Sequence, residues 1–420
     1  MIRKNLRQLS SHVLPISYAI FLLGFFILPS AKFHSNFFYI GVTFPFLVFI
    51  FMKKVDLGAL FRDRTFLLVT IYLVYMFCSL FWADSLEIND LSKYGRRLLY
   101  IIIFIAISVH LAKNYEYFFS KLVHSVFSIS ALVALTTMGI FYLQHPFPGT
   151  RLFGYGLLDN PFQASSIYGI TVLVCTYFLL RQRSFGMRLA YLGLLLVSFS
   201  YMLLAQSRSA LLSLVIAMAV WQLFAWSPGK KGRGIQRKRL LIVLAIIVAG
   251  SASLFLIFPG FFDSAFLSRP SLYRLKLWGK LLTRIEAAPW FGHGLSADPR
   301  TEILPGRILV HPHSVVMGTL LYGGIVGLLL LLAVVISTLW QGFMRIEKPI
   351  DLLVASMALY GALCIVLNGN MLIHHPKPFW LFFWFPVALV VASEMPGHPL
   401  PGDSRISNDR VATSPASALN

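Results

Sequence analysis

Charged residues are scarce in this chain, and acidic ones are the scarcest. Of 420 residues, 36 are Lys or Arg and 16 are Asp or Glu, so 12% are charged while 57% are hydrophobic. Soluble globular domains carry about 25% charged residues, so this composition excludes an ordinary soluble domain. The net charge of +20 is expected to orient the chain in a membrane and to face lipid headgroups. It is no evidence for nucleic acid binding.

Cysteine is also rare. Cys78, Cys175 and Cys364 each fall inside an apolar run, and there is no CxxC pair. With no pair in an exported loop, we expect neither a disulfide nor a cysteine metal site, and the three side chains are expected to pack in the core.

Long apolar runs dominate what remains. Runs of about 17–25 residues can cross a hydrocarbon core of about 30 Å as helices. Backbone polar groups must be satisfied inside the bilayer, so the fold class is an all-α polytopic membrane protein. The basic start of the chain resembles a signal peptide, but no small-residue cleavage site follows, and we expect a retained first span. We predict about twelve transmembrane helices, at 13–29, 37–52, 66–82, 98–112, 122–143, 162–180, 189–206, 210–226, 240–258, 314–340, 352–367 and 379–395.

The distribution of basic residues predicts the orientation. Twelve spans put both termini on one side of the membrane. If that side is the cytoplasm, the cytoplasmic segments hold 22 of the 36 Lys and Arg residues, including the cluster at 230–239. The positive-inside rule therefore favours cytoplasmic termini and an exported segment 259–312.

This exported segment is far longer than the other connections. It divides the chain into spans one to nine (1–258), the long loop (259–312), spans ten to twelve (313–395) and a polar tail (396–420). A connection of this length is usually functional. The tail is rich in Pro, Ser, Asp and Asn and is expected to be a disordered cytoplasmic end.

Within the long loop, Ser271 to Ala287 is predicted to form an amphipathic helix that could lie flat at the membrane interface. Pro289 follows it, and Gly292-His293-Gly294 is expected to turn. Arg274 lies in the middle of the apolar arc, where its charge either reaches back to water or points at a ligand. The predicted arc consists of Leu275, Trp278, Leu281, Leu282 and Ile285.

His311-Pro312-His313-Ser314 opens the tenth predicted span, with Ser314 as its expected N-cap. Histidine can accept or give a proton near neutral pH, so His313 is the candidate base at the membrane surface. A structural interfacial histidine is the alternative interpretation. His311 is either a second candidate base, an orienting partner or a surface residue.

Arginines on the same predicted side are candidates for binding phosphate. Arg208 follows Ser207, an expected N-cap, so free amides and a helix dipole favour an anion beside its guanidinium. Arg151 and Arg97 are further candidates, and each of the three has the alternative of anchoring a loop or lipid headgroups. With Arg274 and His313, they indicate chemistry at the membrane surface on a phosphate-bearing lipid.

The sequence predicts no metal and no cofactor. Histidines at i and i+2 across Pro312 offer no tetrahedral ligand set, and no cysteine or paired carboxylates complete one. The predicted outer segments also lack an Asp-x-Asp pair, which many lipid-linked glycosyltransferases use to hold a metal. The charge of a leaving pyrophosphate would then have to be met by arginines.

Three motifs carry a resemblance to the O-antigen ligase family. His313-Ser314, nine residues and then Gly324-x-x-Gly327 is similar to its His-[Asn/Ser/Gln]-x9-Gly-x-x-Gly motif. Arg274-x-x-x-Trp278, followed by Pro289-Trp290-Phe291-Gly292-x-Gly294, resembles the signature preceding that histidine. The stretch from Gln206 to Leu211 looks like its Ser-Arg-[Gly/Ser]-Ala element. The resemblance covers roughly residues 200–330.

The resemblance implies a GT-C-like glycosyltransferase at the periplasmic face of the bacterial inner membrane, working without metal or ATP. Its donor would be O-antigen on undecaprenyl pyrophosphate, and its acceptor a sugar hydroxyl of lipid A–core. In that reaction His313 would accept the hydroxyl proton. Arg208 and Arg274 would hold the pyrophosphate, and attack opposite it would invert the anomeric centre.

Three alternatives remain at this point. An O-antigen polymerase would use the same donor but often shows two sizeable outer loops, where one is predicted here. A protein O-oligosaccharyltransferase is usually longer, with an extra exported C-terminal region. A transporter or lipid flippase commonly has twelve spans, but it usually shows repeated halves and ionisable residues within spans. The polar candidates here cluster at one interface, which favours an enzyme.

Overall fold

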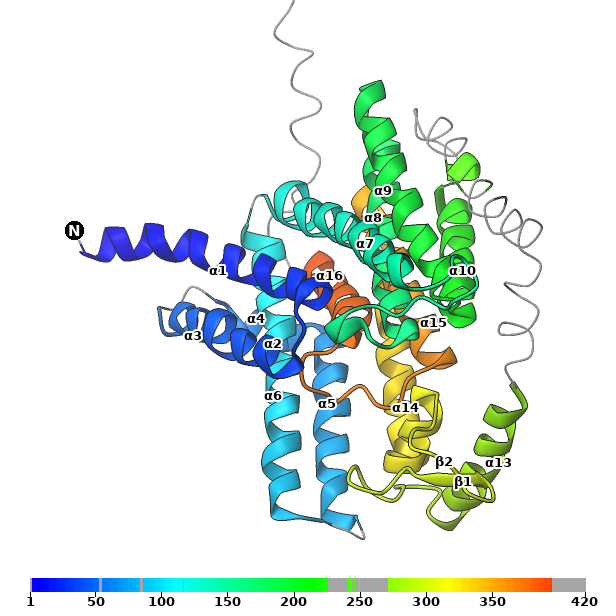
Figure 1. The fold of residues 1–420 in the computed structure, drawn as a ribbon. Helices are drawn as coiled ribbons and strands as arrows, with labels where there is room; N and C mark the ends of the chain where they lie inside the picture. The colour runs from blue at the N-terminus through cyan, green and yellow to red at the C-terminus, as the bar shows by residue number, and fades with distance from the viewer. Residues whose placement is uncertain are drawn as a thin grey trace, which may run out of the picture.

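The structure, a computed structural model, describes residues 2–52, 55–83, 86–115, 117–225, 240–243, 245, 249 and 271–394. This part of the chain folds as a bundle of helices with one small hairpin (Figure 1). The elements are α1 (Ile2–Ile27), α2 (Ala31–Phe37), η1 (Phe38–Thr43), α3 (Phe44–Phe51), α4 (Leu57–Arg62), α5 (Arg64–Cys78), η2 (Ser79–Trp82), α6 (Ile88–Asn114), η3 (Phe118–Val123), α7 (His124–Gln144), η4 (Gly156–Leu158), α8 (Pro161–Arg181), α9 (Phe185–Leu204), α10 (Arg208–Ala225), α13 (Ser271–Ala287), β1 (Thr301–Leu304), β2 (Arg307–Leu309), α14 (Val315–Met344), α15 (Pro349–Leu367), η6 (Trp380–Trp384) and α16 (Phe385–Glu394).

Within the described residues, nine helical segments are long and apolar enough to cross a membrane, and Val13–Ile27 and Trp380–Ser393 are shorter apolar helices. They coincide with eleven of the predicted runs, so the polytopic, mainly helical class is confirmed. The fourth begins ten residues earlier than predicted, at Ile88, because its helical backbone continues through polar residues that hydropathy does not detect. Of the predicted run 240–258, the structure describes residues 240–243, 245 and 249, and the rest lies outside the described residues. The count of twelve therefore stays a prediction, as do the domain boundaries and the disordered tail.

The core is built around α8, α15 and α16. Of the apolar window of α8, 83% is buried, against 33% for α10. A helix that is hydrophobic all round needs partners on every side, and α8 packs against α7, α9, α10 and α15. Trp380 and Trp384 are fully buried beside it. The start of α8 and the end of α15 thereby become fixed walls for the cavity described below.

The predicted amphipathic helix forms with the predicted bounds, as α13, and the protein covers one flank of the predicted arc. Leu275 and Leu282 are exposed (60% and 46%), whereas Leu277, Leu281 and Ile285 are buried. The buried stripe is thus rotated, because α13 packs against β1 and α14. A helical wheel cannot tell which flank a neighbouring element will cover. Arg274 lies in line with this buried stripe and is itself half-buried.

The long loop is also not purely helical. β1 and β2 pair antiparallel, with Glu302 opposite Ile308. The turn between them contains Pro305 and Gly306, and Gly306 has a positive φ of 75°, which glycine adopts without strain. The loop therefore contains a hairpin at 301–309 beside the predicted amphipathic helix.

A break in α14 receives part of the same loop. Gly324 has φ 62° and ψ −161° in the middle of the helix, a conformation that is almost exclusive to glycine. The amide of Ile325 donates to the carbonyl oxygen of Pro289 at 2.8 Å. The amide of Val326 donates to that of Trp290 at 3.2 Å. Loop carbonyls thus replace the acceptors that the broken helix cannot supply.

The helix carbonyls before the break are satisfied in the same way. Leu321 accepts from the amide of His293 at 2.8 Å, and Tyr322 accepts from Gly294 at 2.9 Å. The turn predicted at 292–294 is present, with positive φ at both glycines. The loop 289–294 and the broken helix therefore form one unit, which joins two motifs that are separate in the sequence.

Candidate active site

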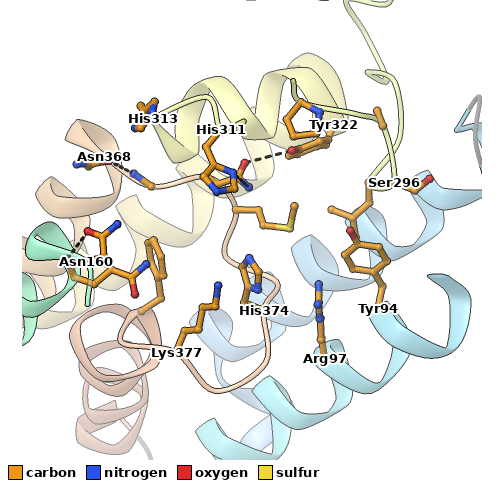
Figure 2. Close-up of a pocket in the computed structure, with 18 of the residues that line it drawn as sticks. Tyr94, Arg97, Asn160, Ser296, His311, His313, Tyr322, Asn368, His374 and Lys377 are labelled. Atoms are coloured by element: carbon orange, nitrogen blue, oxygen red, sulfur yellow. Dashed lines mark hydrogen bonds between the residues drawn. The ribbon is translucent and has the colours of Figure 1, made fainter. Parts of the chain in front are cut away.

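A cavity of about 480 Å³ opens where six parts of the chain meet (Figure 2). Its walls come from α6, the start of α8, the segments around 295–299 and 311–313, α14, and the connection between α15 and η6. The residues that line it are Tyr94, Arg97, Asn160, Phe162, Gln163, Leu295, Ser296, Ala297, Asp298, Pro299, His311, His313, Tyr322, Asn368, Gly369, Asn370, Met371, His374, Lys377 and Phe379.

His313 lies at the start of α14 in a constrained backbone conformation. Its φ is +55°, which is uncommon for a residue other than glycine and is typical of functional positions. The next residue, Ser314, caps α14 as predicted, accepting from the amide of Met317 at 3.5 Å. Its hydroxyl also donates to the carbonyl oxygen of Val366 at 3.0 Å. These contacts fix the backbone that presents the half-buried imidazole to the cavity.

α13 is tied to both helices that border His313. The Trp278 indole N–H donates to the carbonyl oxygen of Pro312 at 2.9 Å. One turn earlier, Nη1 of Arg274 is 3.4 Å from the carbonyl oxygen of Leu367, the last residue of α15. The predicted residues Trp278 and Arg274 thus both lie next to the predicted base. The helical wheel left open whether Arg274 reaches back to water or points at a ligand. Its contact with Leu367 shows that the side chain turns toward the protein.

Arg274 is within electrostatic range of two other predicted residues, His313 and Arg208. The pKa of His313 is lowered by burial, then by the nearby charge of Arg274, and then by His311. The pKa of Arg274 is lowered by burial and by the charge of Arg208. Arg208, Arg274 and His313 come from three distant segments, and only the tertiary structure could bring them together. At neutral pH the lowered pKa keeps the imidazole in its neutral, proton-accepting form.

Arg208 is the first residue of α10, and hydrogen bonds hold the turn before it. Gln206 has φ +50°, and Ser207, directly before the helix as predicted, is buried. Nε of Arg151 donates to the carbonyl oxygen of Ala205 at 2.9 Å. Arg151 therefore braces this turn. Among the described residues, the cavity lining includes none of the three arginines Arg151, Arg208 and Arg274.

His311 lines the cavity beside His313 and is held by hydrogen bonds. Its Nδ1 is 3.3 Å from the side-chain amide of Asn370, which acts as the donor. The oxygen of that amide accepts from the Tyr322 hydroxyl at 3.3 Å. Burial and the charge of Lys377 lower the pKa of His311. The lowered pKa values favour the neutral form of both histidines. In His311 the Asn370 amide occupies the Nδ1 lone pair, which places the proton of the neutral ring on Nε2.

The cavity also contains residues that the sequence did not single out. Asn370, His374 and Lys377 come from the connection between α15 and η6, and Tyr94 and Tyr322 from α6 and α14. His374-His375-Pro376-Lys377 precedes the last predicted span on the same predicted side as His-Pro-His. That similarity was the signal available in the sequence. Arg97, named beforehand as a further candidate, lines the cavity too.

The chemistry of the lining is cationic and imidazole-rich. Its acid, Asp298, is 2.8 Å from Arg300 in an exposed ion pair. In the described part of the chain, no three His, Cys, Asp or Glu side chains are grouped to hold a metal ion. Such a cavity can accept a proton and bind anionic groups.

Comparison with known proteins agrees with these motifs. Residues 192–332, which include the turn at Arg208, α13 and the break in α14, match the family model described as O-Antigen ligase. Over 388 residues, covering 92% of each chain, the sequence is 26% identical to the O-antigen ligase of Pseudomonas aeruginosa strain PAO1. The resemblance to the O-antigen ligase family is therefore confirmed.

Proposed function

Because this chain is a relative of the O-antigen ligases, with an O-antigen ligase-type function as a multi-pass membrane enzyme, we propose that it transfers O-antigen from undecaprenyl pyrophosphate to a sugar hydroxyl of lipid A–core. The reaction takes place at the periplasmic face of the bacterial inner membrane, with both termini in the cytoplasm. It requires neither metal nor cofactor and inverts the anomeric centre.

In the proposed reaction the acceptor hydroxyl enters the cavity and meets His313. The imidazole takes the hydroxyl proton while the oxygen forms a bond to the anomeric carbon. The bond from that carbon to the pyrophosphate oxygen breaks on the opposite face, which produces inversion. The negative charge that develops on the leaving oxygen is stabilised by the guanidinium groups of Arg208 and Arg274.

One observation carries this proposal: Arg274 is within electrostatic range of both His313, which lines the cavity, and Arg208, and the three residues come from separate segments. A base and a pair of phosphate-binding cations are what a metal-independent transfer from a pyrophosphate donor needs. The whole-length similarity to a curated O-antigen ligase favours ligation over polymerisation. The clustering of these residues near one cavity favours an enzyme over a transporter.

The test is ligation by the purified protein, with undecaprenyl-pyrophosphate-linked glycan and lipid A–core. Wild type is compared with His313→Ala and His311→Ala, each with its melting temperature measured. Loss of a general base lowers the rate by about 10²–10⁴, so His313→Ala is expected to give no visible lipopolysaccharide ladder. His311→Ala should retain measurable ligation if it orients rather than accepts the proton.

Other products would contradict the proposal in distinct ways. Longer lipid-linked glycan without attachment to lipid A would indicate a polymerase. Attachment to a protein acceptor instead would indicate an oligosaccharyltransferase. Loss of ligation in His311→Ala alone would move the base from His313 to His311.

A further inference from the structure

A second group of cations lies in the cavity, away from Arg208 and Arg274. Arg97 comes from α6, and Lys377 comes from the connection between α15 and η6. Figure 2 shows the side chains of Arg97, His374 and Lys377 extending into the same space, across from His311 and His313. The proton acceptor and these cations thus occupy opposite sides of one cavity.

These cations are close enough to affect one another. Burial and then the charge of Arg97 lower the pKa of Lys377, while Asp159 acts in the opposite direction. Burial, then Lys377 and Arg97, lower the pKa of His375 to about 4. Among the described residues, neither Arg97 nor Lys377 takes part in an ion pair within 4.0 Å. Holding like charges together in a half-buried wall costs free energy unless an anion binds there.

The surrounding contacts show that the group is built into the fold. The guanidinium of Arg97 lies over the Tyr94 ring, 5.0 Å from its centroid. The Trp380 indole N–H donates to the carbonyl oxygen of His374 at 3.2 Å, which fixes the connection that carries Lys377. Nδ1 of His374 is buried and has no hydrogen-bond partner among the described residues, so its hydrogen-bonding capacity is unused.

We propose that Arg97 and Lys377 form a second anion site, which binds a phosphate group of the acceptor glycolipid. The inference rests on the proposed function, in which Arg208 and Arg274 bind the pyrophosphate of the donor. The acceptor hydroxyl then has to reach His313 through the cavity, so the cations on the opposite side face the acceptor. Binding there would hold the hydroxyl in position for attack.

The test measures binding of the acceptor alone to the purified full-length protein, without donor and without turnover. Wild type is compared with Arg97→Gln, Lys377→Gln and the matched control Arg96→Gln. Arg96 neighbours Arg97 on α6 and is outside the cavity lining. The ligands are lipid A–core, the same glycolipid after removal of its phosphates with hydrofluoric acid, and lipid A alone.

We expect wild type to bind phosphorylated lipid A–core at least about tenfold more tightly than the dephosphorylated form, since a charge-assisted contact contributes about that factor. Arg97→Gln and Lys377→Gln should lose this difference, while Arg96→Gln keeps it. Lys377→Arg should recover part of it, which separates charge from folding. If lipid A alone competes for binding, the bound phosphate belongs to the lipid headgroup. If lipid A alone does not compete, the bound phosphate belongs to the core.

Equal binding of phosphorylated and dephosphorylated acceptor by wild type would overturn the proposal. A loss of affinity in the variants that is equal for both acceptors would also overturn it. The same holds if the variants weaken binding of the lipid-linked donor instead. Because this measurement needs no product, absence of ligation would contradict the proposed function without deciding the second anion site. Where ligation proceeds, the variants should raise KM for the acceptor and leave KM for the lipid-linked donor unchanged.

Discussion

The indole N–H of Trp278 donates to the carbonyl oxygen of Pro312 at 2.9 Å, directly before the candidate base. Two motif residues that are 34 positions apart are thus joined by one hydrogen bond. Its effect is to hold the backbone before His313, whose φ of +55° needs support from its surroundings.

Trp278→Phe removes this donor and retains most of the ring. A buried carbonyl left without its partner costs about 1–3 kcal/mol, and the cost is expected to fall on the positioning of His313. We predict roughly a tenfold lower kcat for ligation, with KM for the lipid-linked glycan unchanged. The matched control is Trp340→Phe, because Trp340 is 65% exposed near the far end of α14. An equal loss in both variants would show that the effect is not specific to this hydrogen bond.

The rate of ligation is predicted to fall on the acid side with an apparent pKa below the usual histidine value of about 6.5. Burial and the charge of Arg274 lower the pKa of His313, and only the neutral imidazole accepts a proton. Arg274→Gln removes a cation, so the pKa of His313 should rise and the acid limb should move to higher pH. The rate of ligation is measured against pH for wild type, for Arg274→Gln and for the control variant.

The control for this shift is Lys276→Gln, which removes the same charge from an exposed position on α13. Its acid limb should coincide with that of wild type. An unmoved limb in Arg274→Gln would mean that His313 is not the group titrating in the rate.

Gly324→Ala is predicted to destabilise the protein. A Cβ at this position would lie 2.4 Å from the carbonyl carbon of Trp290, and the backbone conformation is one that alanine rarely adopts. The expected cost is at least about 1–3 kcal/mol, observed as a lower melting temperature and faster proteolysis of the loop 289–294. Gly279→Ala is the control, since nothing lies within 4 Å of its Cβ. It should preserve or raise stability, by about 0.5–1 kcal/mol.

Ligation is predicted to continue in EDTA. In the proposed reaction the guanidinium groups of Arg208 and Arg274 meet the charge of the leaving pyrophosphate, which many related reactions assign to a metal ion. The measurement is the initial rate with EDTA and after addition of Mg²⁺ or Mn²⁺. A rate that falls in EDTA and recovers with the metal would refute the arginine assignment.

The arrangement of elements along the chain was largely readable from the sequence. Eleven apolar runs became helices because bilayer-length hydrophobicity and backbone satisfaction leave few other structures. The bounds of α13 were predicted from its periodicity and from Pro289. The cap at Ser314 and the turn at Gly292 and Gly294 are local features, so short-range patterns predicted them.

Which residues meet in space was decided by the tertiary structure. The buried face of α13 depends on where β1 and α14 pack, which its own periodicity does not contain. The loop 289–294 fills the break at Gly324 through hydrogen bonds between distant segments. Lys377 faces the same cavity as His313 because α15 and η6 pack against α8 and fix the connection between them. The sequence by itself determined helices, caps and motifs, since these depend on neighbouring residues. The cavity has His311 and His313 on one side and Arg97 and Lys377 on the other. This arrangement depends on packing between residues far apart in the chain, which patterns of neighbouring residues do not reveal.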